Sequence, residues 1–285
     1  DTTQDIPTRI AESIGLSFHG QDPLQKQLLD FLKDKETLLV LDNLEHLFDD
    51  AGSFVALLVD ILRSAPGVKL LVTSRERINL YDEVIFDVSG LDVPTTTSIE
   101  DFSAGALFLQ GAQRMQRNYL PTTSEKESIA HICRLVEGMP LALELASAWT
   151  RNYSSAEIAA QIESDLDFLA SPYKDLSAGH RSLRAVFERS WSLLTSDEQT
   201  IYTQLTVFRG GFALDAAKVV VRIESSSVNV EIAVTALADK SLLQRHPDER
   251  YDIHPLLRQF AAEKLSASGL DFEALSTDHA SYYLK

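Results

Sequence analysis

The sequence predicts an α/β region at the start of the chain, followed by an all-α region. Two short apolar runs, Leu38–Leu41 and 69–73, flank an amphipathic helical pattern over about 50–64. Strand, helix and strand in this order form a βαβ unit, in which the two strands are parallel. After Pro94 only helical patterns occur as far as about residue 172. We therefore expect a partial parallel sheet and then a helical region.

Two helices are expected before the first strand, and a third strand after the second. Ile6, Ile10 and Ile14 recur every four residues, and a second apolar stripe begins after Asp22–Pro23. Because Leu38–Leu41 is continuously apolar, we expect this strand to be buried on both faces of the sheet. Residues 84–88 give a third short strand.

The middle of the chain predicts four helices and then a linker. One helix covers 102–117, and the next opens at Ser124 with Glu127 as a capping box. Gly138 ends that helix and Pro140 starts the third. The fourth follows Ser154–Ser155, and 171–180 resembles a linker in composition.

The last third predicts helices and one hairpin, an order that indicates a winged-helix arrangement. Strands 241–245 and 250–254 flank a short turn, and a final amphipathic helix covers 272–285. The other helices expected here are 182–194, 196–207, 213–221, 229–240 and 256–267. Thr195 and Glu198 form a capping box at the start of the second of these.

Composition limits the class of protein. The 285 residues carry a net charge of −16, so non-specific binding to nucleic-acid phosphates is disfavoured. No apolar run is long enough for a membrane span, and the start has no signal-peptide pattern. The single cysteine, Cys133, excludes a disulfide framework and fits a cytoplasmic location.

Asp42 is the candidate metal ligand. It directly follows a predicted buried strand, and ligands of open α/β sheets bind beyond the carboxyl ends of the strands. This is the form of a Walker B segment, whose aspartate holds the Mg²⁺ of a nucleoside triphosphate. The alternative is that Asp42 and Asn43 serve only as turn or N-cap residues.

Thr73, Ser74 and Arg75 end the second strand and should open into the same crevice as Asp42. The arginine is suited to a terminal phosphate, and the hydroxyls to water or a metal ion. The alternative is a turn in which Arg75 forms a surface ion pair with Glu76 or Asp82.

Two further candidates lie in the helical part. The backbone near Pro140 can pack against a flat base, and the alternative is a plain loop between helices. His254 follows a predicted strand and precedes Pro255, where an imidazole can contact a phosphate; the alternative is a capping or partly buried histidine. The phosphate-binding loop G-x-x-x-x-G-K-[ST] is absent, because no glycine is followed by lysine.

Five segments together resemble the STAND class of signal-transduction ATPases, in particular the NB-ARC-like modules of large bacterial transcriptional regulators. Residues 38–47, LLVLDNLEHL, resemble their Walker B segment, and 69–80, KLLVTSRERINL, their sensor 1 segment. EGMPLALELAS (137–147) is similar to their GxP motif, and YDIHPLLRQFAAEKL (251–265) to their MHD-type motif. STDHASYYLK (276–285) resembles the start of a TPR-like repeat region.

The resemblance implies four parts. Residues 1–92 would be a partial nucleotide-binding domain, 93–178 a helical lid domain, 179–268 a winged-helix domain, and 269–285 the start of the repeats. It also implies roles: Mg²⁺ at Asp42, the γ-phosphate at Arg75 with Thr73 and Ser74 beside the nucleotide, adenine at Pro140, and the β-phosphate of ADP at His254.

Three departures from the family pattern affect this expectation. The phosphate-binding loop and its strand are missing, which would leave three strands with a gap or a re-pairing at their middle. Asn43 stands where many such ATPases have an acidic base, and Glu45 is less well placed, so hydrolysis should be slow. Pro255 replaces the aspartate that the last motif often has.

The main hypothesis is an ATP/ADP-dependent switch module of a signalling or transcription regulator, truncated at both ends. An upstream effector, a downstream repeat sensor and self-oligomerisation are the expected partners, and this chain alone should bind nucleotide weakly and be inactive as an ATPase. The alternatives are a winged-helix DNA-binding protein and a nucleotide-free interaction scaffold built on a degenerate ATPase.

Overall fold

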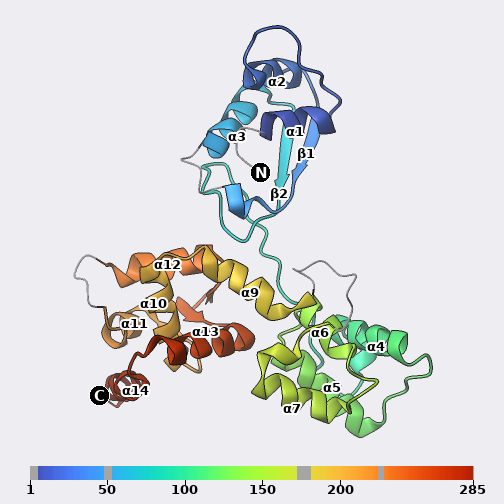
Figure 1. The fold of residues 1–285 in the computed structure, drawn as a ribbon, viewed down its shortest axis with the longest axis vertical. Coiled ribbons are helices and arrows are strands. Elements are labelled where there is room, and N and C mark those ends of the chain that lie inside the picture. Colours follow the sequence, from blue (N-terminus) through green and yellow to red (C-terminus); the bar gives the residue numbers. More distant parts are fainter. Residues whose placement is uncertain (1–5, 48–52, 172–180, 224–227, 285) are drawn as a thin grey trace. The chain divides into compact units, whose positions relative to one another are not determined.

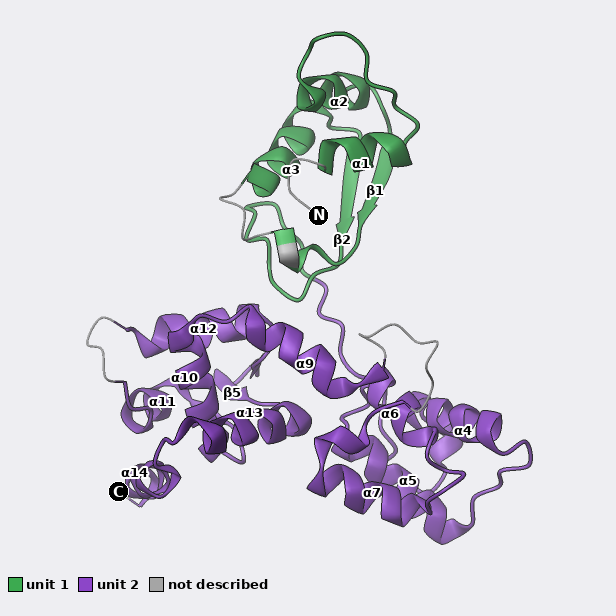
Figure 2. Cartoon of the chain, viewed as in Figure 1, with its two compact units in different colours: residues 1–85 green, residues 86–285 purple. Residues whose placement is uncertain are grey.

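The computed structural model describes residues 6–47, 53–171, 181–223 and 228–284. The chain forms two compact units, residues 1–85 and 86–285, shown in Figure 2. Most of the expected linker, residues 172–180, lies outside the described residues.

The first unit contains the predicted βαβ arrangement (Figure 1). Strand β1 (Thr37–Leu41) pairs in parallel with β2 (Val68–Val72), and α3 (Ser53–Ser64) connects them. The register places Leu39 opposite Leu70 and Leu41 opposite Val72, so the two strands end side by side. The predicted parallel pairing is therefore confirmed.

The described residues cover only one face of this sheet. Helices α1 (Ile6–Ser13) and α2 (Leu24–Leu32) contribute Ile10 and Leu28 to a core that also contains Leu39. On the other face Leu38, Val40 and Leu71 are 58%, 60% and 54% exposed. The expectation that the first strand is buried on both faces is wrong, because within the described residues no second layer packs on this row.

The predicted third strand, 84–88, does not form. These residues lie outside every described strand, and Val84, Phe86 and Val88 are almost fully exposed. The described sheet of this unit has only two strands. A short apolar segment forms a strand only where a neighbouring strand pairs with its backbone hydrogen-bonding groups, and no described strand does so here.

The second unit begins with helices in the predicted order. They are α4 (Ser103–Met115), α5 (Thr123–Leu135), α6 (Pro140–Ser147) and α7 (Ser155–Ser164), with 3₁₀ turns η3 (Ile99–Asp101) and η4 (Leu166–Phe168). The capping box of α5 uses Thr122 and Glu125 instead of Ser124 and Glu127. Both pairs have the same spacing, and the helix starts at the pair directly after Pro121.

The last third combines helices with a small antiparallel sheet. Strand β5 (Arg250–Asp252) pairs with β4 (Gln244–Arg245), which confirms the hairpin, and with β3 (Phe212–Ala213), which the sequence did not predict. The remaining elements are α9 (Leu183–Ser192), α10 (Ser196–Gln204), η5 (Leu205–Val207), α11 (Leu214–Val220), α12 (Val230–Asp239), α13 (Pro255–Ser268) and α14 (Phe272–Tyr283).

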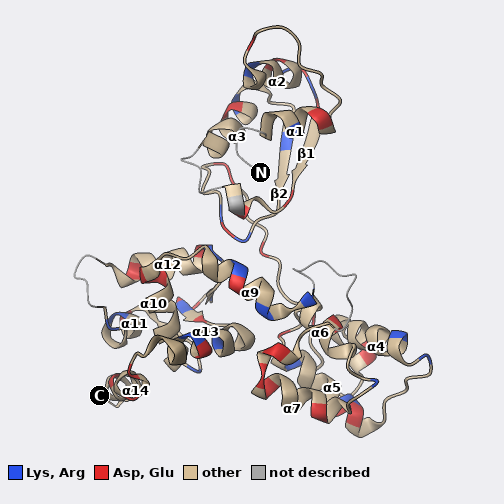
Figure 3. Cartoon of the chain, viewed as in Figure 1, with Lys and Arg blue, Asp and Glu red and all other residues tan. Residues whose placement is uncertain are grey.

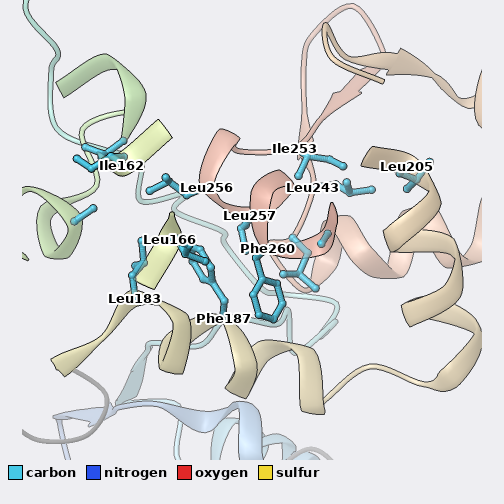
Figure 4. Packing of buried hydrophobic residues seen from close by; sticks show 14 of the residues in the cluster. Ile162, Leu166, Leu183, Phe187, Leu205, Leu243, Ile253, Leu256, Leu257 and Phe260 are labelled. Atoms are coloured by element: carbon cyan, nitrogen blue, oxygen red, sulfur yellow. The ribbon is translucent and has the colours of Figure 1, made fainter. Parts of the chain in front are cut away.

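One hydrophobic core runs through the second unit, from Ile99 to Leu275. Figure 4 shows Leu166 of η4 among side chains of α9 and α13. The rings of Phe187 and Phe260 meet edge to face at 5.9 Å. At the rim, Arg184 forms ion pairs with Asp167 and Glu263. The helices before and after residues 172–180 therefore share one core. None of the helices in the described part of the chain has the length and apolar content to cross a bilayer.

Candidate functional site

The ends of β1 and β2 bring Asp42 and Thr73 into contact. The Thr73 hydroxyl donates a hydrogen bond to the Asp42 carboxylate, and the Thr73 amide donates to the Leu41 carbonyl at 3.0 Å. The Asn43 amide in turn donates to Thr73 Oγ1 at 3.0 Å. The prediction that these residues share one edge of the sheet is therefore confirmed.

Asn43 turns the chain sharply after the strand. Its φ of 63° lies in the left-handed region, which asparagine tolerates better than most residues. The Leu44 amide then donates to the Thr73 carbonyl at 3.2 Å, and the chain enters the short 3₁₀ helix η2 (Leu44–Leu47). Asp42 and Asn43 are thus turn residues, as the alternative interpretation held. This does not prevent Asp42 from binding a metal ion, because its side chain is exposed.

The turn places Glu45 against Arg75. The Glu45 side chain is only 2% exposed, and its Oε1 lies 3.4 Å from Arg75 Nε. Arg75 remains 32% exposed, and the adjacent Ser74 accepts a hydrogen bond from the Glu76 amide at 3.1 Å. Within the described residues Arg75 thus forms an ion pair with Glu45, a partner that the sequence had not indicated.

The donor set at this edge fits a hard cation. Mg²⁺ is usually held by one or two carboxylates together with water and substrate phosphates. Asp42 supplies an exposed carboxylate and Thr73 a neighbouring hydroxyl. Among the described residues, no three His, Cys, Asp or Glu side chains gather as a metal site. A cation here would therefore need most of its ligands from phosphate and water.

Pro140 and His254 lie in the second unit, both at the junction between α5 and α6. Pro140 is exposed and is the first residue of α6. His254 is 8% exposed, and its Nε2 lies 3.2 Å from the carbonyl oxygen of Val136, at the end of α5. The six predicted site residues of the first unit and these two thus form two groups, one in each unit.

Both ring nitrogens of His254 have partners. Nδ1 accepts a hydrogen bond from the Leu256 amide at 3.2 Å and so caps α13. That bond requires an unprotonated Nδ1, so Nε2 carries the proton and donates to Val136. Burial lowers the pKa of His254, an effect opposed by Glu137, 3.8 Å away, and by the Val136 bond. The alternative interpretation, a capping and buried histidine, agrees with this geometry.

The junction also contains a backbone contact that the sequence did not reveal. Glu137 and Gly138 both have positive φ, 46° and 68°. The Leu91 amide donates to the Gly138 carbonyl at 2.9 Å. A Cβ on Gly138 would lie 2.0 Å from the Leu91 carbonyl oxygen, and one on Gly90 would lie 2.0 Å from that of Glu137. Glycine is needed at both positions because the two backbones are in contact and leave no room for a Cβ. In the sequence, the isolated glycines were the only sign of this contact.

Helix α12, a candidate for contacting DNA, presents acidic rather than basic groups. Val230–Asp239 contains Glu231 and Asp239 but no lysine or arginine (Figure 3). Lys218 of α11 is 2.7 Å from Glu231, so its charge is partly neutralised. Binding to a DNA backbone requires clustered positive charge. The geometry therefore gives no support to DNA binding by this helix.

Sequence relatives of the chain include mycobacterial proteins that are named as putative transcriptional regulators. A protein of Mycobacterium bovis named "Putative HTH-type transcriptional regulator" is 32% identical over 283 residues, which is 98% of this chain and 31% of that protein. The chain thus spans about a third of the length of this relative. No protein-family model matches the chain.

Solved structures of ATPases resemble the chain. A Walker-type ATPase of Pyrococcus abyssi aligns with 89% of this chain and 74% of its own, at 14% identity and a TM-score of 0.52. A STAND protein of Pyrococcus horikoshii with a tetratricopeptide repeat sensor aligns with 93% of this chain and 33% of its own, at 17% identity and a TM-score of 0.31. The likeness to the first of these shows that the chain has an ATPase-like fold.

Proposed function

We propose that the chain is the core of an ATP/ADP-dependent switch in a transcription or signalling regulator. The observation that carries the proposal is the contact between Asp42 and Thr73 at the ends of two adjacent parallel strands. Ligands of open α/β sheets bind at this place, and the donor set fits Mg²⁺ with phosphate oxygens. In this proposal Asp42 holds Mg²⁺, and Arg75 contacts the γ-phosphate with Thr73 and Ser74 beside it.

The proposed site needs a phosphate-binding loop, which these 285 residues do not supply. The exposed row Leu38, Val40 and Leu71 supports a missing layer, because parallel sheets are normally covered on both faces. A further strand at the edge of the sheet, followed by a helix packed on this face, would bury the row. Such a strand would also give residues 84–88 a partner. We therefore expect this chain alone to bind nucleotide only weakly.

The second unit supplies the proposed regulatory part. Residues 93–178 would form the lid with Pro140 beside adenine, 179–268 the winged helix, and 269–285 the start of a helical repeat sensor. His254 would reach the β-phosphate of ADP by exchanging its Val136 partner for a phosphate oxygen. ADP would then favour a closed state, and ATP a state that permits self-oligomerisation with effector and sensor domains attached.

Slow hydrolysis is part of the proposal. Asn43 cannot act as a base, because an amide does not accept a proton at neutral pH. Glu45, an acid close to the end of β1, is buried and paired with Arg75. A switch of this kind depends on nucleotide exchange, so turnover should be low in the complete protein and absent in this chain.

The test is calorimetric titration of ATP and ADP, with Mg²⁺, into the natural polypeptide that contains residues 1–285 and into residues 1–285 alone. We expect saturable binding by the former and at most millimolar binding by the latter. If residues 1–285 alone bound Mg-ATP with micromolar affinity and lost it on Asp42→Ala, the need for a phosphate-binding loop would be refuted. Absence of binding in the natural polypeptide would refute the switch and favour a nucleotide-free scaffold.

A further inference from the structure

We propose that Glu45 is a positioning residue for Arg75, which it holds so that the site can distinguish ATP from ADP. This inference rests on the proposed function, because it assumes that Arg75 contacts the γ-phosphate. In this inference Glu45 does not act as a general base.

The geometry of the turn places Glu45 for this role. Two hydrogen bonds fix Asn43 and Leu44 to Thr73, at 3.0 and 3.2 Å, so the chain after β1 is tied to the end of β2. Glu45 follows directly, and Arg75 lies two residues beyond Thr73. The carboxylate and the guanidinium are therefore brought together by a rigid backbone frame, with Oε1 and Nε 3.4 Å apart.

Burial distinguishes the two acids at this edge. Asp42 is exposed, whereas Glu45 is 2% exposed. A general base must reach the water that it activates, directly or through one other water. A carboxylate enclosed in this way and facing a guanidinium is better suited to hold that cation. Asp42 with Thr73 then remains the part of the site open to metal and phosphate.

The physical advantage is in the orientation of the arginine. A free arginine side chain loses rotamer freedom when it binds phosphate, and this entropy loss reduces the favourable free energy of binding. An ion pair through Nε fixes the plane of the guanidinium before the nucleotide arrives, and this planar group binds phosphate through directed hydrogen bonds. Glu45 also balances the charge of Arg75 in the nucleotide-free protein. The contribution of Glu45 to binding affinity should appear with ATP and be absent with ADP, which lacks the γ-phosphate.

The experiment compares affinities for ATP and ADP in the natural polypeptide containing residues 1–285. Glu45→Gln keeps the size of the side chain and removes its charge, and Arg75→Lys keeps the charge and removes the planar group. Glu36→Gln is the matched control, because Glu36 is an exposed acid just before β1, at its opposite end. Thermal unfolding of each variant without nucleotide measures any general loss of stability.

We expect the ratio of ATP affinity to ADP affinity to fall about tenfold in Glu45→Gln and in Arg75→Lys, and to stay unchanged in Glu36→Gln. The double variant should lose little more than Arg75→Lys alone, because both changes act through one arginine. A purely structural Glu45 would weaken ATP and ADP equally, and that result overturns the inference. If the unchanged protein bound neither nucleotide, the proposed function itself would be refuted, and with it the inference. If it bound both without preference, Arg75 would not be a γ-phosphate contact, and the inference would also fail.

Discussion

Replacement of His254 tests how the α5–α6 junction is held to α13. In His254→Ala, the Leu256 amide loses its cap, which costs about 1 kcal/mol. The bond to the Val136 carbonyl contributes about 1 kcal/mol more. That carbonyl also accepts the Met139 amide at 2.8 Å, so it is not left without a partner. The expected loss in the free energy of unfolding is therefore about 2 kcal/mol.

His254→Asn separates the two contributions. Asparagine is a good N-cap residue, but its side chain is shorter and should not reach Val136. We expect this variant to lose about 1 kcal/mol, half the loss of the alanine variant. Urea unfolding followed by tryptophan fluorescence is a suitable assay, because both tryptophans, Trp149 and Trp191, lie in the second unit.

The same residue predicts a dependence on pH. Burial lowers the pKa of His254 in the folded state, whereas the unfolded side chain titrates near pH 6.5. As the pH falls below about 6.5, the unfolded state binds a proton that the folded state does not, so stability decreases. The loss continues until the pH passes the lowered folded-state pKa. His254→Asn should remove this part of the pH dependence.

Two results would contradict these roles of His254. An alanine variant within about 0.5 kcal/mol of the unchanged protein would show that the two hydrogen bonds carry no net stability. A pH profile that is identical in the unchanged protein and in His254→Asn would show that this imidazole does not titrate differently in the two states.

Two further pairs of substitutions test the packing, one pair in each unit. Gly138→Ala should destabilise the second unit by about 3 kcal/mol, because Gly138 has φ 68° and a Cβ there would lie 2.0 Å from the Leu91 carbonyl oxygen. Gly269 has a similar φ of 75° but open space around it, so Gly269→Ala should cost only about 1 kcal/mol. The urea assay described above measures both variants. In residues 1–285 alone, Leu39→Ala should destabilise the first unit by about 3 kcal/mol, whereas Leu38→Ala should change it by less than about 0.5 kcal/mol, since Leu39 is 5% and Leu38 58% exposed. Hydrogen exchange of the β1 amides measures this second pair, and equal losses within either pair would contradict the packing described.

Much of the secondary structure could be predicted, because periodicity and capping residues act locally. The parallel strands β1 and β2 followed from two apolar runs with a helix between them, and the Thr195–Glu198 capping box is present. The prediction of a strand at 84–88 was wrong, because an apolar composition shows only that a segment suits a strand. Whether the strand forms depends on a partner, which the sequence pattern of one segment does not contain.

The candidate site could be predicted in part. Strand ends determine position, so Asp42 and Thr73 were correctly expected at one edge. The pairing of Glu45 with Arg75 could not be foreseen, because it depends on the left-handed turn at Asn43. The contact of Leu91 with Gly138 depends likewise on a long-range approach of two backbones, for which no local pattern exists.

The dependence of nucleotide affinity on Mg²⁺ is the sharpest test of the proposed metal-nucleotide site at Asp42. In the natural polypeptide containing residues 1–285, ATP affinity is measured with Mg²⁺ and with EDTA, for the unchanged protein, for Asp42→Ala and for the control Asp60→Ala in α3. If Asp42 holds the metal ion at the sheet edge, Mg²⁺ should raise ATP affinity in the unchanged protein and the control but not in Asp42→Ala. An equal Mg²⁺ effect in all three proteins would contradict a metal-nucleotide site at the ends of β1 and β2.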